Sequence, residues 1–280
     1  MKHSWDLSGR HLFKGKNGMK RILELCVKMG ERFITFLEYI GGVVTLLVQT
    51  LAWIFIPPLK GKRIIEQMSV IGWESLPIVS MIALFIGIVL ALQSAYQLQK
   101  LSADIYIASL VSLSVTREIG PVITALVVAG RVGAAIAAEL GTMKVTEQID
   151  ALETLATNPV KYLVVPRFLA TTLMLPVLTV YADYIGIFGG YLFGVYKLGI
   201  GSSLYWRMTY QPLILKDVFT GLIKSVFFGM IIAIIGCYEG FRVYGGAEGV
   251  GRATTLAVVT SFILIIAADC LFTTLFYFAF

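Results

Sequence analysis

A small set of charged side chains lies within or at the ends of long apolar runs, and these are the residues whose chemistry most needs an explanation. The set consists of Arg117, Glu118, Arg131, Asp183, Lys224 and Asp269. If these runs cross a membrane, each charge costs at least ~2.5 kcal/mol near a helix centre unless it is paired or hydrated. Two bases, Arg117 and Lys224, and two acids, Glu118 and Asp269, could neutralise one another if their helices meet. This buried charge network is either a proton or ion relay or a structural set of ion pairs.

Motifs for bond-making chemistry are missing from the sequence. The three cysteines, Cys26, Cys237 and Cys270, are far apart, and the two histidines, His3 and His11, both lie near the N-terminus. The sequence contains no G-x-x-x-x-G-K-[ST] phosphate loop, no H-E-x-x-H and no G-x-S-x-G. We therefore expect no catalytic residue, no metal site and no cofactor in this chain, and any energy source has to come from another subunit.

The segment 141–167, GTMKVTEQIDALETLATNPVKYLVVPR, is unusually polar for its place between two apolar runs. Its charged residues recur every three positions and its apolar residues fall at i, i+4, i+7 and i+11, which predicts an amphipathic helix from Thr146 to Ala156, ended by Asn158-Pro159. At ~1.5 Å per residue this helix is about 16 Å long, too short to cross a bilayer. Three acids and one lysine would be repelled by anionic lipid, which favours a protein partner over a solvated surface. The polar residues expected at that contact are Lys144, Thr146, Glu147, Asp150 and Glu153.

The composition indicates an integral membrane protein. Of the 280 residues, 58% are hydrophobic and 14% are charged, and the mean hydropathy is +0.83. The apolar residues form blocks of helical length rather than short alternating strands, so the expected fold class is all-α, a polytopic helical membrane protein. Five transmembrane helices are predicted, over residues 74–97, 118–139, 165–195, 213–238 and 254–278.

An earlier apolar block, residues 33–58, ends at Pro57-Pro58 and is followed by the basic segment 60–63. If this block crossed the membrane, the basic segment would lie outside, against the positive-inside rule. We therefore predict an N-terminal helix in the membrane interface, with a plain spanning helix as the alternative.

The distribution of basic residues predicts the orientation. Eight lysines and arginines precede the first apolar block, which is typical of a segment next to cytoplasmic lipid head groups rather than nucleic acid. With this tail inside, Lys144, Lys161, Arg167, Arg242 and Arg252 also fall inside. The N-terminus and the polar segment are then cytoplasmic, and the C-terminus is external.

Small residues and an outer polar group complete the candidate features. Gly130, Ala134 and Ala138, and likewise Gly186, Gly190 and Gly194, are spaced four apart, which allows close helix packing within one chain or across a dimer. At the outer end of the first span, Leu92, Gln93 and Tyr96 are candidates for lipid contact or for interfacial anchoring.

The sequence resembles the MlaE/YrbE family, the permeases of MCE-type ABC lipid transporters. The similarity covers roughly residues 60–280 and is densest in REIGPVITALVVAGRVGAAIAAELGTMKVTEQIDALETLATNPVKYLVVPR, with GRATT at 251–255 as a second mark. Matching positions carry over the family's buried charges to Arg117, Glu118, Lys224 and Asp269, and its coupling segment to 143–159. The sequence departs from the family pattern in a longer basic tail and in LQSAY, where a Gln-Gly-Tyr-like turn is expected.

The resemblance implies a homodimer of five-span subunits in a bacterial inner membrane, with a periplasmic C-terminus. It implies two cytoplasmic ABC ATPase subunits that bind ATP and Mg, a periplasmic ring of MCE proteins and, as a further partner, a small STAS-type accessory subunit. It also implies that glycerophospholipid moves between the inner and outer membranes, which maintains outer-membrane lipid asymmetry.

The resulting interpretation divides the chain into a basic cytoplasmic tail (1–32), an interfacial helix and elbow (33–63) and a five-span permease domain (64–280). It is a transport subunit and not an enzyme. Two rivals remain: an ion-gradient-driven secondary transporter or channel, and an intramembrane enzyme acting on lipid, which the absent motifs disfavour.

Overall fold

The computed structural model describes residues 10–57, 60–101 and 103–279, and the side chains within 28–57, 60–100 and 103–278. Residues 1–9 of the predicted basic tail, with His3, and the side chain of Cys26 lie outside the described part. The regular structure of the described residues is entirely helical, which confirms the predicted all-α membrane fold. The chain divides into two units, Met1–Thr45 and Leu46–Phe280.

The first unit contains most of α1 (Arg10–Ile54), a helix that begins within the segment predicted as a tail. Large apolar side chains along it, such as Phe33, Phe36 and Leu37, are at least half exposed. Apolar side chains this exposed need lipid or protein to cover them. Its part Lys28–Ile54 is long and apolar enough to cross a membrane, so interfacial placement stays a prediction.

Five further segments of the described chain are also long and apolar enough to cross a membrane, and they correspond to the five predicted spans. They are Gly61–Leu98, Asp104–Val145, Val160–Tyr196, Leu215–Phe241 and Gly246–Phe278. The largest difference concerns the second span, for which the sequence predicts a start at residue 118 and which is helical from Asp104 onward. Arg117 and Glu118 resemble a polar helix end, but both form ion pairs with residues of α9, and the helix continues through them.

The second span is a chain of short helical pieces. After the 3₁₀ turns η1 (Gln99–Leu101) and η2 (Asp104–Tyr106) come α3 (Ile107–Ser114), α4 (Gly120–Val128) and α5 (Ala134–Val145). Two π-helical turns, η3 (Val115–Ile119) and η4 (Ala129–Gly133), separate the α-helical pieces. Each π turn contains an arginine, Arg117 or Arg131, and such turns are frequent at functional sites.

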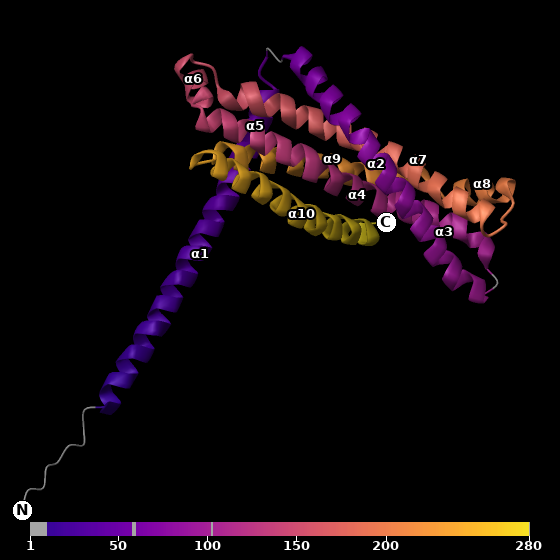
Figure 1. Cartoon of the computed structure of the whole chain (residues 1–280), viewed down its shortest axis with the longest axis horizontal. Coiled ribbons are helices and arrows are strands. Elements are labelled where there is room, and N and C mark those ends of the chain that lie inside the picture. The colour runs from indigo at the N-terminus through magenta and orange to yellow at the C-terminus, as the bar shows by residue number, and fades with distance from the viewer. Residues whose placement is uncertain (1–9, 58–59, 102, 280) are drawn as a thin grey trace, which may run out of the picture. The chain divides into compact units, whose positions relative to one another are not determined.

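The core of the second unit consists of long helices that lie side by side (Figure 1). Helix α2 (Gly61–Leu98) packs along α7 (Val165–Tyr196), and α9 (Leu215–Phe241) packs against α5, α7 and α10 (Gly246–Ala279). A Cβ atom on Gly87 would lie 1.8 Å from the carbonyl oxygen of Gly186, so α2 and α7 are in backbone contact there. Gly190 likewise faces Val111 of the same chain, which supports packing within one chain for the ridge of Gly186, Gly190 and Gly194, whereas Gly130 of the other ridge is exposed.

Two short helices lie at opposite ends of this unit (Figure 1). Helix α6 (Gln148–Thr154) connects α5 with the π turn η5 (Val160–Val164) and α7, and α8 (Ser202–Tyr210) connects α7 with α9. Tyr205 of α8 is fully buried, and Gly190 and Gly194 leave the space that its ring occupies. Consequently α8 is fixed at the end of α7, and the far end carries the polar segment.

Candidate functional site

The π turn η3 presents the first part of the charged site. Pro121 has no N–H group and its ring would collide with the carbonyl of residue i−4, which is Arg117. The wider turn Val115–Ile119 accommodates this, and the Gly120 N–H bonds to the Val115 carbonyl. The carbonyl of Arg117 is left facing α9, where Lys224 Nζ lies 3.5 Å away.

Helix α9 approaches this turn closely because Gly221 has no side chain. A Cβ atom at Gly221 would lie 2.4 Å from the carbonyl oxygen of Thr116. Asp217, Gly221 and Lys224 are spaced i, i+4 and i+7, so they share one face of α9. The close contact at Gly221 therefore brings one acid and one base of α9 against η3.

Lys224 is the centre of a set that we call the Lys224 cluster, formed with Glu118, Asp269 and Thr273. The Lys224 side chain is 1% exposed, and its Nζ lies 2.5 Å from Glu118 Oε2 and 2.9 Å from Asp269 Oδ1. Nζ also donates to Thr273 Oγ1 at 2.7 Å, and this hydroxyl donates to Glu118 Oε2 at 3.1 Å. Three spans therefore meet at one ammonium group, whose three N–H bonds all have acceptors nearby.

Arg117 has a different partner. Its Nε lies 3.0 Å from Asp217 Oδ1, and the Arg117 side chain is 53% exposed whereas that of Asp217 is 7% exposed. Asp217 Oδ2 also accepts the N–H of Ile214 at the start of α9. Arg117 and Glu118 thus reach different neighbours, as adjacent positions about 100° apart on a helix require.

The sequence interpretation missed Asp217, and this changes the charge balance. Arg117 and Lys224 are two cations, whereas Glu118, Asp217 and Asp269 are three acids, so the formal sum is −1. The predicted set of four is therefore neutral in itself but incomplete. The i, i+7 spacing of Asp217 and Lys224 on an apolar helix was the signal that could have found it.

The other charges of the apolar runs are separate from this cluster. Arg131 pairs with Glu74 of α2 at 2.5 Å, and Arg167 pairs with Glu139 at 2.8 Å. Asp183 Oδ1 is buried without a hydrogen-bond partner among the described residues, and it lies against Gly120, where a Cβ atom would be 1.8 Å away. Among the described residues, no three His, Cys, Asp or Glu side chains are grouped as metal ligands.

The polar segment is helical over a shorter range than predicted. The expected continuous helix from Thr146 to Ala156 is wrong, because α5 ends at Val145 and Glu147 adopts a left-handed conformation with φ 59°. Helix α6 covers only Gln148–Thr154, and Ala156 is again left-handed. The left-handed Glu147 turns the chain sharply at the end of α5.

The polar side chains of this segment point mostly to the outside. Thr146, Glu147, Asp150 and Glu153 are exposed, and Lys144 pairs with Asp150 at 2.7 Å. Ile149 is buried beneath them, whereas Leu155 is 75% exposed. The segment is thus anchored by one apolar residue and an internal ion pair, and it presents acids together with an apolar side chain.

The lipid-contact candidates lie on one outward face of α2. Leu92 is 52% exposed and Tyr96 is 69% exposed, and Gln93 is exposed beside them. Lys100 Nζ lies 4.3 Å above the Tyr96 ring. None of the three is a partner of Lys224 or Arg117, and their lipid contact stays a prediction.

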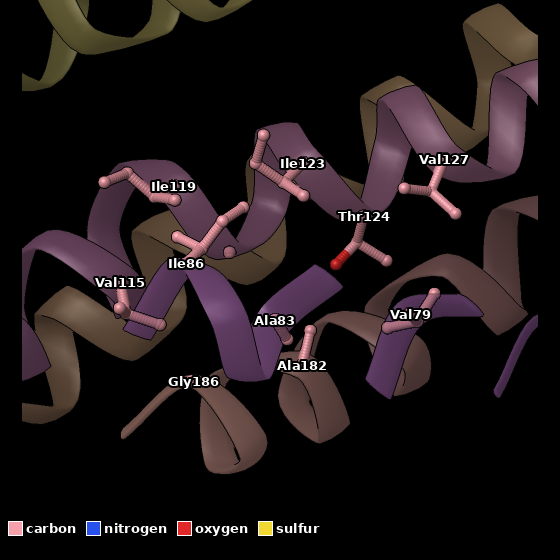
Figure 2. A pocket seen from close by; sticks show the side chains of 11 residues that line it. Val79, Ala83, Ile86, Val115, Ile119, Ile123, Thr124, Val127, Ala182 and Gly186 are labelled. Atoms are coloured by element: carbon pink, nitrogen blue, oxygen red, sulfur yellow. The ribbon is translucent and has the colours of Figure 1, made fainter. Parts of the chain in front are cut away.

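A small cavity lies inside the second unit between α2, the η3–α4 segment and α7 (Figure 2). Its volume is about 20 Å³, and apart from Thr124 its labelled lining is apolar or glycine. Thr124 Oγ1 is buried without a hydrogen-bond partner among the described residues. One water needs ~10–15 Å³, so this cavity has room for about one water and none for a lipid.

A wide, shallow hollow that is mostly open to the surroundings lies on one face of α10, and all its lining residues belong to this helix. It has a volume of about 690 Å³ and is lined by Ala267, Cys270, Leu271, Thr274, Leu275 and Phe278. It adjoins in sequence two members of the Lys224 cluster, Asp269 and Thr273. An apolar surface large enough for acyl chains thus begins next to a group of fixed charges.

Comparison with known proteins gives a consistent family. The profile described as Permease MlaE matches residues 64–275. A "Probable ABC transporter permease protein" of Rickettsia felis is 49% identical over 256 residues, which is 91% of this chain and 99% of the relative. The "Intermembrane phospholipid transport system permease protein MlaE" of Haemophilus influenzae is 39% identical over 211 residues, covering 75% of this chain and 81% of the relative.

Proposed function

Because this chain belongs to the MlaE permease family and is an ABC transporter permease, we propose that it transfers glycerophospholipid between a bacterial inner membrane and the outer membrane, driven by ATP. The phospholipid substrate follows the Haemophilus influenzae relative, whose name states intermembrane phospholipid transport. Such transfer would maintain the lipid asymmetry of the outer membrane. ATP and Mg would be bound by a separate cytoplasmic ATPase, and this chain would make or break no bonds.

The exposed polar segment around α6 is the observation that carries ATP coupling. Glu147, Asp150 and Glu153 are exposed together with Leu155, between two membrane-spanning segments. Acids are repelled by anionic lipid, and an exposed leucine gains from burial, so a protein surface suits this segment better than a membrane. The Lys144–Asp150 ion pair ties α6 to the end of α5, so movement of a docked ATPase would be passed to the second span.

The hollow on α10 supports a lipid path between two copies of the chain. Acyl chains would lie on its apolar lining, and a head group would lie near Asp269 and Thr273. One helix face encloses only one side of a lipid, so a second copy would supply the other side.

By this proposal the assembly also holds a periplasmic MCE ring and a small STAS-type accessory subunit. The N-terminus is cytoplasmic and the C-terminus periplasmic, with basic residues concentrated inside.

A charge-reversal experiment tests the coupling. Glu147 and Glu153 form no ion pair with a described residue, so E147K/E153K changes the outer charge without breaking an internal contact. The matched control is E248K, an equal type of change at an exposed residue near the start of α10. We expect E147K/E153K to lower ATPase co-purification and ATP-dependent transfer of labelled phospholipid between vesicles by at least tenfold, whereas E248K retains both. Normal ATPase recovery with E147K/E153K would contradict the proposed docking surface.

The ion-driven rival is favoured by one observation, the surplus carboxylate of the charged site. Three acids face two bases at membrane depth, so a transported proton or cation has a place to bind. An uncoupler separates the two functions in reconstituted vesicles at constant ATP. Lipid transfer that persists supports the ATP-driven permease, and transfer that collapses supports the gradient-driven carrier.

A further inference from the structure

We propose that a basic pocket between the start of α2 and the start of the α7 segment binds the head group of an anionic membrane phospholipid. The pocket has a volume of about 150 Å³, and its lining includes Lys60, Ile64, Asn158, Lys161, Tyr162 and Pro166. We call it the head-group pocket. It is formed by residues other than those of the Lys224 cluster and does not depend on the proposed transport function.

Two cations, Lys60 and Arg63, lie over the Tyr162 ring of this pocket, and a third, Lys161, lies over the ring of Trp53. Lys60 Nζ lies 4.2 Å and the Arg63 guanidinium carbon 3.8 Å from the centre of the Tyr162 ring, and Arg63 donates a hydrogen bond to the Tyr162 hydroxyl. Lys161 Nζ donates to the Pro57 carbonyl at 3.3 Å and lies 5.3 Å from the Trp53 ring centre. These contacts hold the cations in place, but a ring face and a carbonyl carry no full negative charge.

None of these three cations has a carboxylate within 4 Å among the described residues. This distinguishes them from Arg131, Arg167 and Lys224, each of which pairs with an acid. Like charges held close together repel one another, most strongly where water is partly excluded. An anion in the pocket would remove this repulsion and accept hydrogen bonds from Lys60 and Lys161.

The rest of the lining suits a lipid phosphate better than a free ion. Asn158 Oδ1 accepts the N–H groups of Val160 and Lys161, which leaves the side-chain NH₂ of Asn158 as a donor for a phosphate oxygen. Ile64 and Pro166 add an apolar wall that can contact the first carbons of an attached lipid.

The level of the pocket in the membrane fits this ligand. It lies where two membrane-spanning segments begin, Gly61–Leu98 and Val160–Tyr196. The 38 residues of α2 measure about 57 Å at ~1.5 Å per residue, against ~30 Å for the hydrocarbon core. The helix is therefore long enough to extend into the head-group layer. Tryptophan and tyrosine side chains, such as those of Trp53 and Tyr162, are enriched in this layer.

The test measures lipid retained by the purified full-length chain. The protein is delipidated in a mild detergent, phosphatidylglycerol or phosphatidylcholine is added, and bound lipid is counted by native mass spectrometry. We expect phosphatidylglycerol to be retained at least tenfold better than phosphatidylcholine, and K60Q/R63Q to lose this preference. The matched control K62Q/K197Q removes two charges from exposed lysines outside the pocket and should keep it.

Two further measurements test the role of the Tyr162 ring and distinguish a lipid from free phosphate. Tyr162→Leu keeps every charge but removes the ring that positions Lys60 and Arg63, so it should weaken phosphatidylglycerol retention several-fold even if K60Q/R63Q fails to fold. Inorganic phosphate at about 10 mM should not displace the lipid. Equal retention of the two lipids, unchanged retention in Tyr162→Leu, or displacement by inorganic phosphate would each overturn the proposal.

Discussion

Lys224 is the residue on which the arrangement of the charged site depends most directly. It lies at 1% exposure between two carboxylates and a hydroxyl from two other spans, so the buried ammonium group depends on these partners for charge compensation, while the Glu118 and Asp269 side chains are 42% and 23% exposed. A buried ion pair adds little net stability when intact, but removing one partner is expensive. The consequences of substitution can therefore be ranked.

We expect Lys224→Met to be the most damaging single change at this site. It leaves the Glu118 and Asp269 carboxylates close together without a cation; the cost of such a loss reaches roughly 3–5 kcal/mol for a fully buried pair and is smaller where the remaining carboxylates are partly exposed. The thermal unfolding temperature in detergent and reconstituted lipid transfer should both fall. Lys197→Met, at an exposed lysine, is the control and should leave both unchanged.

Asp269→Asn should be milder than Lys224→Met, because Lys224 keeps Glu118 and Thr273 as partners. The triple variant E118Q/K224M/D269N removes all three charges and should recover part of the unfolding temperature. A triple variant no more stable than Lys224→Met would show that the pairing is not what stabilises these helices.

Tyr205 gives a pH-dependent prediction. Its ring is fully buried, its hydroxyl has no hydrogen-bond partner among the described residues, and burial raises the pKa of Tyr205 above its usual value. A pKa raised in the folded state gives a stability contribution that is complete below the unfolded value of ~10 and is lost as pH rises beyond it. Between about pH 9 and pH 12, the unfolding temperature of the wild type should therefore decrease more than that of Tyr205→Phe. Equal decreases in the two proteins would contradict the prediction.

At the level of elements, the contact of α9 with the π turn η3 depends on Gly221. A Cβ atom there would be 2.4 Å from a backbone oxygen, which cannot move away as a flexible side chain could. We expect Gly221→Ala to push α9 away from η3 and to cost about 1–3 kcal/mol, as other overpacked contacts do. Thermal unfolding and lipid transfer should both decline.

The control for this change is Gly251→Ala in α10, where nothing lies within 4 Å of the added atom. An alanine has a higher helix propensity than glycine, so Gly251→Ala should be neutral or slightly stabilising. If Gly221→Ala behaved like Gly251→Ala, the approach of α9 would have enough freedom to absorb a methyl group, and the close contact would not position Lys224.

For the whole molecule, the prediction with the largest consequence is that α1 lies in the membrane interface and does not cross the membrane. Gly30 and Gly61 lie on either side of the apolar part of α1, and Gly201 lies between the third and fourth predicted spans. Cysteine is tolerated sterically at all three, since nothing lies within 4 Å of an added Cβ atom. In a background without the native cysteines, an impermeant thiol reagent added outside spheroplasts should label Gly201→Cys and neither Gly30→Cys nor Gly61→Cys.

The same three variants distinguish the alternatives. If α1 spans the membrane, Gly30→Cys and Gly61→Cys lie on opposite sides and only one of them is protected. If both are protected and Gly201→Cys is labelled, the two ends of the apolar part of α1 lie on the same, inner side of the membrane. The charge-based orientation then holds.

Several properties of this protein follow from the sequence alone. The length and polarity of the apolar runs determine that the described chain is helical and that five segments downstream of Pro57 can cross a membrane. In lipid, the backbone N–H and C=O groups of such a segment have no water to bond with, and a helix forms all their hydrogen bonds within the segment. The cost of a charge in lipid likewise singles out Arg117, Glu118, Lys224 and Asp269 before any contact is known. These inferences depend on local composition, which the sequence displays directly.

Only the tertiary structure determined which charges meet. Asp217 meets Arg117, and Lys224 meets Glu118, because Gly221 lets α9 approach the π turn that Pro121 imposes on the second span, and Thr273 joins Lys224 from α10. The left-handed Glu147 that shortens the polar helix has no signal in the sequence either, since glutamate rarely adopts that conformation. The contact of Lys60 and Arg63 with the Tyr162 ring joins residues about a hundred positions apart. Such features depend on the distance between helices and on the backbone path, and these are set by packing among distant residues rather than by any one stretch of the chain.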